Sequence, residues 1–364
     1  MSTTMNGLGA SVRRIGDGLL VRYSVALRRS AMVGVVACLA IGAHPTASAT
    51  PSSSTDHPAT VQTGSYVVRT EVADDTAMTA FVHSAAMDRT IPLKILRSPD
   101  RTAPSPTLYL LNGAGGGVDG MDWYTQTDVV SFFADKNVNV VTPVGGAYSY
   151  YTDWQHDDPV LGRNKWETFL TAELPPLVDD LLETNGRNAI AGISMAATSV
   201  LNLAAHHQGL YRAVGSYSGC ASTTDALGRA YVKTVVSMAL GANVTNMWGP
   251  DDHRDWVRND AVVNAEKLRG TALYISNGSG LAGASDTLDG TNPNGPGFVL
   301  LNQMVVGGAI EVATGDCTRR LKTALEQLDI PAHFELRDRG THSWGYWQDD
   351  LHDSWPMFED ALAA

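Results

Sequence analysis

The sequence predicts an α/β domain in which a mostly parallel central sheet carries helices on both faces. The first observation is a set of continuous apolar runs ending in small residues, at 107–113, 137–145, 188–194, 212–219 and 271–278. Such runs are typical of strands buried on both faces of a parallel sheet. The second observation is helical patterning between them, at 128–136, 166–184 and 195–207. Strands that alternate with helices predict a doubly wound sheet whose functional site lies at the strands' carboxyl ends.

The N-terminal part of the chain resembles an export signal. Residues 1–29 hold five arginines against one acid, Asp17, and an apolar run follows at 31–43. That run is shorter than the roughly 20 residues that a membrane-spanning helix needs. Ala47-Ser48-Ala49 offers small residues for cleavage. We therefore expect residues 1–49 to be a signal peptide, with a retained anchor as the alternative, and 50–63 to be a disordered linker.

The composition of the remaining chain excludes one class of partner. The full chain carries a formal net charge of −12, which becomes −16 without the five arginines and one aspartate of the leader. A surface this acidic repels phosphate backbones, so we expect no nucleic-acid partner. We expect a monomer that needs neither cofactor nor metal.

The other elements follow in chain order. Three segments joined by short turns, at 66–72, 79–85 and 90–98, predict strands that precede the parallel sheet. The stretch 222–268 interrupts the alternation and is rich in Asn, Asp and Trp. We interpret it as a helical insertion over the site, within a single catalytic domain of residues 64–364. A last strand-like run lies at 332–337.

The segment "AGISMAA" holds a candidate nucleophile, Ser194. It follows a buried strand and opens a helix, which is the context of a nucleophile elbow. The sharp turn needs small flanking residues, and Ala196 replaces the usual last glycine of the G-x-S-x-G pattern. The alternative is an ordinary serine at a helix N-terminus. An elbow of this kind indicates the α/β-hydrolase fold.

A serine hydroxyl needs a base, and the chain order of this fold predicts a histidine after the last strand. His342, in the loop after 332–337, fits that position. Two carboxylates compete as the acid that orients the imidazole. Asp286 follows the strand at 271–278, the common location for this acid, and Glu311 lies in what looks like the first turns of a helix. The pattern alone favours Asp286.

Two cysteines, Cys220 and Cys317, remain after the leader. An even count in an exported protein favours a disulfide between them, and two separately buried thiols are the alternative.

Several motifs together resemble a known family. In order, they are "YLLNG", "VTPVGGAYSYYTDW", "KWETFLTAELP", "GISMAATSVLNLAAHH", "NMWGPDDHRDWVRNDA" and "GTHSWGYW". They are similar to the secreted mycolyltransferases of actinobacteria, the antigen 85 type, over residues 66–355. That family uses a Ser-Glu-His triad with the glutamate roughly thirty residues before the histidine. The resemblance therefore implies Glu311 as the acid, with Asp286 as the fallback.

The tetrahedral oxyanion of an acyl transfer needs two backbone N–H donors. One is expected from Met195, directly after the nucleophile, and matching to the family implies Ala114 for the other. Relatives that act on trehalose usually carry Asp-Gly-Leu-Arg where this chain has Asn112-Gly113-Ala114-Gly115. In those relatives the acid and the arginine help to hold the sugar, so their absence affects the expected specificity for trehalose but not the acyl-enzyme chemistry. We expect Asn112, Trp166 and Trp344 to contact substrate.

These residues predict a secreted or envelope-associated serine acyltransferase that passes long-chain, mycolyl-type groups from trehalose-like or lipid esters to an envelope glycan or lipid. One alternative is a carboxylesterase with water as the acceptor. The other, from a different functional class, is an envelope-binding protein without catalysis.

Overall fold

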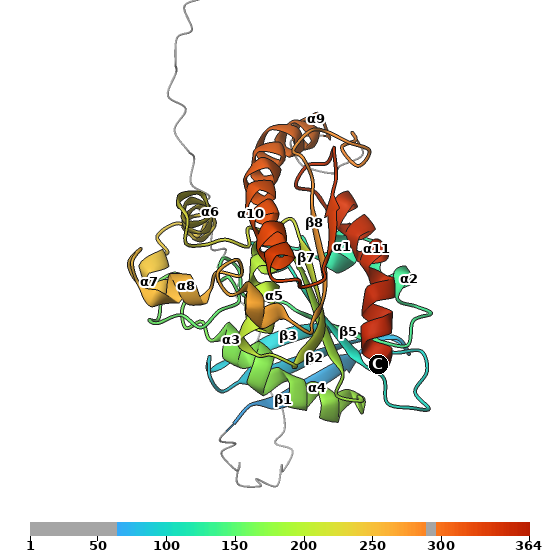
Figure 1. Cartoon of the computed structure of the whole chain (residues 1–364). Coiled ribbons are helices and arrows are strands. Elements are labelled where there is room, and N and C mark those ends of the chain that lie inside the picture. The colour runs from blue at the N-terminus through green and yellow to red at the C-terminus, as the bar shows by residue number, and fades with distance from the viewer. Residues whose placement is uncertain (1–63, 289–295) are drawn as a thin grey trace, which may run out of the picture. The chain divides into compact units, whose positions relative to one another are not determined.

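The computed structural model describes residues 64–288 and 296–364, so the predicted leader and linker lie outside the described residues. These residues build a nine-stranded sheet of order β1-β2-β3-β5-β4-β6-β7-β8-β9 (Figure 1). The strands are β1 Tyr66–Val72, β2 Ala77–Ser84, β3 Arg89–Leu96, β4 Thr107–Leu111, β5 Asn139–Pro143, β6 Asn188–Ile193, β7 Tyr211–Tyr217, β8 Ala272–Asn277 and β9 His333–Leu336.

The sheet is antiparallel at one end and parallel through the rest. β1, β2, β3 and β5 pair antiparallel, whereas the strands from β5 through β4 to β9 run parallel. Every residue of β4, β5 and β6 is buried. This confirms the predicted fold class, because only strands covered on both faces can be apolar throughout. The carboxyl ends of six parallel strands consequently meet at one edge, where loops can bring distant residues together.

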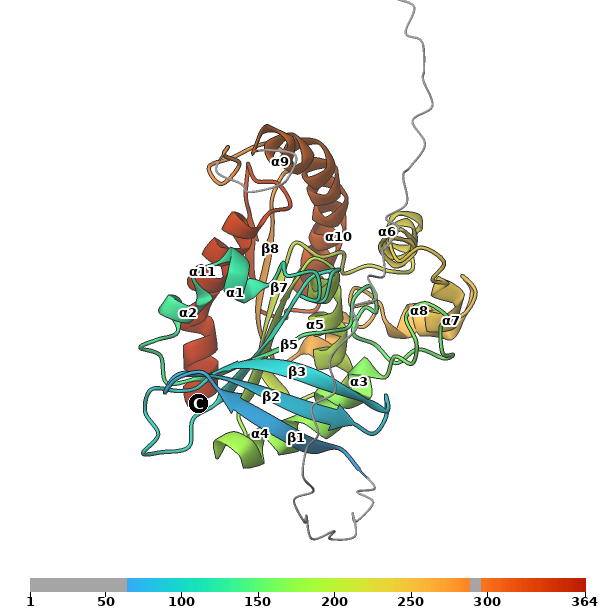
Figure 2. The same ribbon diagram turned by 180° about the vertical axis from the view of Figure 1, so that it is seen from behind.

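Helices cover both faces of the sheet, as Figures 1 and 2 show. One apolar core packs under α4, α5 and α10, and a second packs under α1, α2 and α11. The helices are α1 Trp123–Gln126, α2 Val129–Phe132, α3 Trp166–Thr168, α4 Leu174–Leu182, α5 Met195–His206, α6 Ala226–Ser237, α7 Val244–Trp248, α8 Arg254–Arg258, α9 Pro296–Asn302, α10 Gly308–Gln327 and α11 Trp344–Ala363, with π turns at Phe169–Glu173 and Gln303–Gly307 and a 3₁₀ turn at Ala265–Leu268.

The helix predicted at 166–184 is continuous but not uniform. A π turn, Phe169–Glu173, separates α3 from α4 directly before Pro175 and Pro176. Proline lacks the N–H of a regular helical bond, so a wider turn before the pair accommodates the missing donors. The helix predicted at 128–136 is shorter than its pattern and forms only the four residues of α2.

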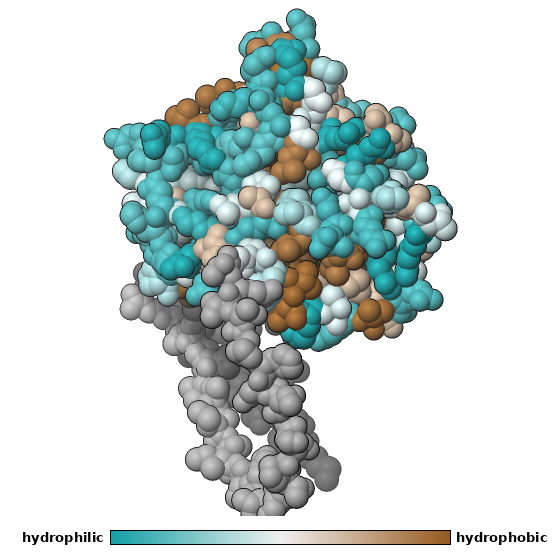
Figure 3. All heavy atoms as spheres, turned by 90° about the horizontal axis from the view of Figure 1, so that it is seen from below, coloured by the Kyte–Doolittle hydropathy of each residue, from teal (hydrophilic) through white to brown (hydrophobic). Residues whose placement is uncertain are grey.

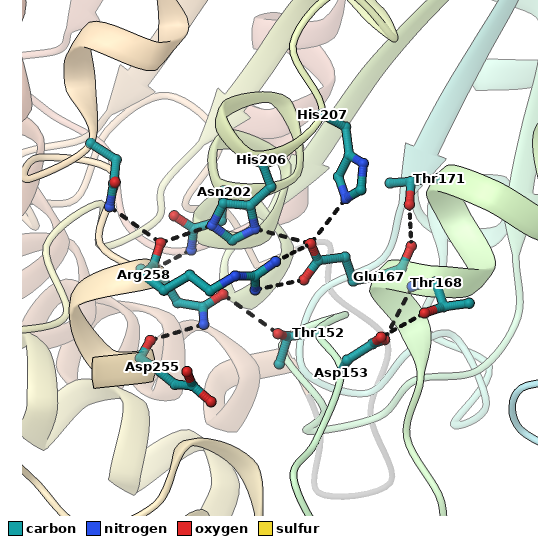
Figure 4. Close-up of polar contacts among 12 residues, drawn as sticks. Thr152, Asp153, Glu167, Thr168, Thr171, Asn202, His206, His207, Asp255 and Arg258 are labelled. Atoms are coloured by element: carbon teal, nitrogen blue, oxygen red, sulfur yellow. Dashed lines mark hydrogen bonds and ion pairs between the residues drawn. The ribbon is translucent and has the colours of Figure 1, made fainter. Parts of the chain in front are cut away.

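The stretch 222–268 connects β7 to β8 through α6, α7, α8 and the 3₁₀ turn. An ion cluster around the buried Glu167 joins it to the main body (Figure 4). The Glu167 carboxylate of α3 receives two bonds from Arg258 of α8, at 2.6 and 2.9 Å. The same carboxylate contacts His206 at 3.1 Å and His207 at 3.0 Å, both at the end of α5. One side chain thus links the insertion to the helix that begins at Ser194.

Seen from below in Figure 3, hydrophilic residues cover most of the described face, and apolar residues gather in small groups.

Candidate active site

Ser194 lies at a sharp turn between β6 and α5. Its φ of 55° and ψ of −121° fall in a region that residues with a side chain rarely adopt. A Cβ atom added at Gly192 would lie 2.8 Å from the Cβ of Ala196, so the turn has no room for a side chain at position 192. The Ser194 N–H donates to the Tyr217 carbonyl of β7 at 2.9 Å. These contacts hold the hydroxyl at the carboxyl edge of the sheet in a strained backbone, as expected of an elbow.

His342 lies between Ser194 and Glu311. Its Nε2 is 2.7 Å from the Ser194 Oγ, and its Nδ1 is 2.7 Å from a carboxylate oxygen of Glu311. A carboxylate only accepts hydrogen bonds, so Nδ1 carries the proton and Nε2 is left to accept from the serine hydroxyl. The Trp347 ring packs edge-on against the imidazole, with ring centroids 4.9 Å apart. The three residues that the sequence singles out therefore form one continuous chain of hydrogen bonds.

Glu311 is fully buried in the first turn of α10. Its second carboxylate oxygen accepts from the Gly278 N–H at 2.6 Å. The Asn277 amide, at the end of β8, donates to the Glu311 carbonyl at 2.9 Å. Both carboxylate oxygens thus have a donor, which a buried charge requires. Sequence reasoning did not identify Asn277 or Gly278, although both lie in the "ISNGSG" segment at the expected edge of the sheet.

Asp286, the fallback acid, lies in a different network. Its carboxylate accepts from the Tyr346 hydroxyl at 2.7 Å, from the Gly283 N–H at 2.8 Å and from the Thr341 hydroxyl. Thr341 directly precedes His342, so Asp286 supports the histidine loop while Glu311 contacts the ring itself.

The glycine-rich loop after β4 approaches the nucleophile. A Cβ added at Gly113 would lie 3.5 Å from the Cβ of Ser194, and the Ala114 carbonyl accepts from the Tyr148 N–H at 2.8 Å. Among the hydrogen bonds of the described residues, the Ala114 N–H has no acceptor. Met195 is the first residue of α5, so its N–H has no partner within the helix. Both amides are available to an incoming oxygen.

The three residues expected to contact substrate differ in position. Asn112 is fully buried. Its side-chain NH2 donates to the Pro143 carbonyl and its side-chain oxygen accepts from the Trp123 N–H, both at 3.4 Å. Trp166 is also buried, against the Gly145-Gly146 turn. Trp344 is half-buried and packs edge-on against Trp123. Asn112 and Trp166 thus support the loops around the site from within, and of the three only Trp344 has appreciable exposed surface.

Tyr231, on helix α6 of the insertion, is a neighbour that the sequence did not reveal. Burial raises the pKa of its phenol to about 12, an effect that the nearby Ser194 hydroxyl opposes and that the Glu311 charge reinforces. Tyr231 thus brings the insertion, which the sequence predicts to lie over the site, close to the nucleophile, although no sequence pattern indicates this particular residue.

A disulfide joins Cys220 and Cys317, as predicted. Cys220 lies after β7, where Thr198 of α5 donates to its carbonyl at 2.9 Å. Cys317 lies six residues after Glu311 on α10. The bridge thus links the segment after β7, to which α5 is hydrogen-bonded through Thr198, to the helix that carries Glu311.

Residues 64–288 and 296–364 hold no group of three or more His, Cys, Asp or Glu side chains arranged to bind a metal ion. None of their helices is both long and apolar enough to cross a bilayer.

The chain is similar to known esterases and acyltransferases. The Esterase family model matches residues 84–358. The diacylglycerol acyltransferase/mycolyltransferase Ag85A of Mycobacterium leprae is 33% identical over 271 residues, which cover 72% of this chain and 77% of that protein. Ag85B of the same organism is 31% identical over 295 residues, 78% of this chain and 83% of the relative.

Solved structures give the same answer for the fold. MPT51 (FbpC1) of Mycobacterium tuberculosis superposes with a TM-score of 0.64 at 26% identity, covering 77% of this chain and 96% of that one. The S-formylglutathione hydrolase of Agrobacterium tumefaciens reaches 0.53 at 16% identity, covering 82% and 99%, a likeness of fold alone. On this evidence the chain is an α/β-hydrolase that belongs to the esterase family, among the antigen 85 acyltransferases.

Proposed function

We propose that this chain is a secreted serine acyltransferase that works through an acyl-enzyme and transfers long-chain, mycolyl-type groups between trehalose-like esters and envelope acceptors. One observation carries the proposal, namely the hydrogen-bond chain from Glu311 through His342 to Ser194 at the carboxyl edge of the sheet. The similarity to acyltransferases of the Ag85 type supports the reaction class.

In the first step, the Ser194 Oγ attacks the ester carbonyl while its proton passes to His342 Nε2. The negative charge moves to the carbonyl oxygen, which accepts from the Ala114 and Met195 N–H groups. Glu311 stabilises the imidazolium that forms. The tetrahedral intermediate then expels the alcohol, which takes the proton from His342, and the acyl group stays on Ser194 as an ester.

In the second step, an acceptor hydroxyl gives its proton to His342 and attacks the Ser194 ester. The same two N–H groups hold the new oxyanion, and Ser194 recovers its proton when the acyl group leaves. The acceptor decides the product: a sugar or lipid hydroxyl gives acyl transfer, and water gives hydrolysis.

A carboxylesterase is the second candidate. It is favoured by the loop Asn112-Gly113-Ala114-Gly115, which lacks a charged side chain for holding a sugar, and by the buried position of Asn112. A non-catalytic envelope protein is the third, and it would not need Ser194 at all. The charged and apolar segments of residues 1–49 support export in each case.

A product assay tests the proposal. Purified protein and its Ser194→Ala variant receive a long-chain acyl ester with and without trehalose. Acyl-trehalose that forms with the wild type and not with the variant supports the transferase. Free acid alone, at a rate insensitive to trehalose, identifies the esterase, and the absence of any Ser194-dependent product rejects both.

A further inference from the structure

A pocket lies beside the glycine-rich loop that carries Ala114. Its volume is about 310 Å³, and its lining includes Arg89, Val118, Leu161 and the Gly145–Ala147 turn. That turn is bonded to the loop, because the Gly145 N–H donates to the Gly116 carbonyl at 2.8 Å. The same loop reaches Ser194 through Gly113. The pocket and the candidate active site therefore share one loop.

Arg89, at the start of β3, gives this pocket a positive charge that no acid neutralises. The half-buried guanidinium contacts the Met87 sulfur at 3.2 Å and the Asn164 side-chain oxygen at 3.5 Å, and it lies 5.4 Å from the centroid of the Trp166 ring. In the described part of the chain no carboxylate forms an ion pair with it. Burial lowers its pKa, and no acidic neighbour opposes that effect.

The turn that lines the pocket adds backbone donors without acceptors. The Gly146 and Ala147 N–H groups donate to no acceptor among residues 64–288 and 296–364, and Gly146 is buried. Buried backbone N–H groups are nearly always bonded to protein, water or ligand. A pocket whose lining holds both unbonded N–H groups and a guanidinium offers the kinds of donor from which a carboxylate or a phosphate accepts.

We propose that this pocket binds the carboxylate or phosphate group of a substrate on which Ser194 acts, with Arg89 as the residue that recognises the anion. The inference rests on the proposed acyl-enzyme function. Val118 and Val160, 64% and 49% exposed, and the half-buried Leu161 give the pocket apolar walls for the carbon chain next to the anion. The Arg89 guanidinium supplies the charged partner for the anion.

The anion can belong to the acyl donor or to the acceptor, and two kinetic arms separate these sources. The donor arm compares mono-4-nitrophenyl esters of dicarboxylic acids with 4-nitrophenyl alkanoates of equal chain length, from short to long. The acceptor arm uses a neutral 4-nitrophenyl ester and compares glycerol with glycerol 3-phosphate as acyl acceptor. Each arm yields a ratio of kcat/KM, anionic over neutral, so a general loss of activity cancels.

In at least one arm we expect Arg89→Gln to lower this ratio about tenfold, because a charge-assisted pair is worth about 1.4 kcal/mol or more. Arg89→Lys keeps the charge and should retain part of the preference. Arg163→Gln is the control, because Arg163 is exposed and already pairs with Asp157 at 3.3 Å. An unchanged ratio in both arms, with neutral esters still turned over, overturns the anion site alone. If the wild-type protein turns over none of these esters in a way that depends on Ser194, the proposed function itself is rejected.

Discussion

At the scale of single residues, three polar side chains around His342 make different contacts and have different roles. Glu311 contacts the imidazole, Ser194 contacts its other nitrogen, and Asp286 supports the preceding Thr341. Sequence pattern alone favoured Asp286, because an acid after that strand is the common arrangement. The contact between Glu311 of α10 and His342 joins residues far apart in the sequence, which no local pattern encodes, and only the family resemblance indicates Glu311.

The assignment of the acid predicts unequal effects of two conservative changes. Glu311→Gln keeps the shape but removes the charge that stabilises the imidazolium, so kcat/KM should fall about 10²- to 10⁴-fold. Asp286→Asn should cost far less, because it alters a support of the loop. Hydrolysis of a 4-nitrophenyl ester measures both. A larger loss in Asp286→Asn than in Glu311→Gln would make Asp286 the acid.

The elbow predicts a steric effect at Gly192. Gly192→Ala places a Cβ 2.8 Å from that of Ala196 and should destabilise the fold by about 1–3 kcal/mol. Ala196→Gly added to it should restore part of that loss, since it removes the nearest atom but leaves the Ala196 backbone 3.0 Å away. Urea unfolding measures the two free energies. If the second change restores nothing, the contact is not the cause.

At the scale of elements, two links determine how the helices around the site are held. The disulfide ties α10 to the segment after β7, and the Glu167 cluster ties the insertion to the end of α5. The cysteine pairing could be predicted because only two cysteines follow the leader. The Glu167 cluster could not, since its four members come from three separate segments.

Removal of the disulfide should destabilise the protein. Cys220→Ala with Cys317→Ala opens a loop that spans 97 residues, and such a loss typically costs about 2–5 kcal/mol. Denaturant unfolding measures it. Reduction of the wild type should reproduce the midpoint of the double variant, whereas the same reductant should leave the variant unchanged. Equal midpoints for oxidised wild type and double variant would contradict a stabilising bridge.

The Glu167 cluster predicts how stability depends on pH. Burial alone would raise the Glu167 pKa, but hydrogen bonds and charges from His206 and Arg258 outweigh it and hold the pKa well below the ordinary value of 4.5. A carboxyl whose pKa is lowered on folding stabilises the protein above its unfolded pKa, and that stability is lost as the pH falls below it. The free energy of unfolding should therefore decline below about pH 4.5.

Glu167→Gln should remove most of that acid-dependent loss and lower stability at neutral pH by about 1–3 kcal/mol, because the buried His206 and the half-exposed Arg258 lose their charged acceptor. Glu266→Gln is the control, since its pair with Arg269 is exposed and should contribute about 0–1 kcal/mol. Unfolding curves from pH 3 to 7 compare the two, and an identical pH profile for wild type and Glu167→Gln would reject this role.

At the scale of the whole molecule, the sequence predicted the sheet well and the helices less well. Each apolar run became a strand, because burial on both faces leaves a continuous signal in the sequence. By contrast, half of the α10 residues are polar or charged and α11 contains Pro356, so neither full helix stands out by local pattern. The proximity of Tyr231 to Ser194 depends on how the insertion folds back, which tertiary packing alone determines.

The mass of the protein after brief exposure to a 4-nitrophenyl ester reports most directly whether Ser194 carries the acyl group. We expect an increase equal to one acyl group, located on the peptide that contains Ser194, absent from Ser194→Ala and lost when an acceptor is added. Acylation of another residue, or an equal increase in Ser194→Ala, would contradict it.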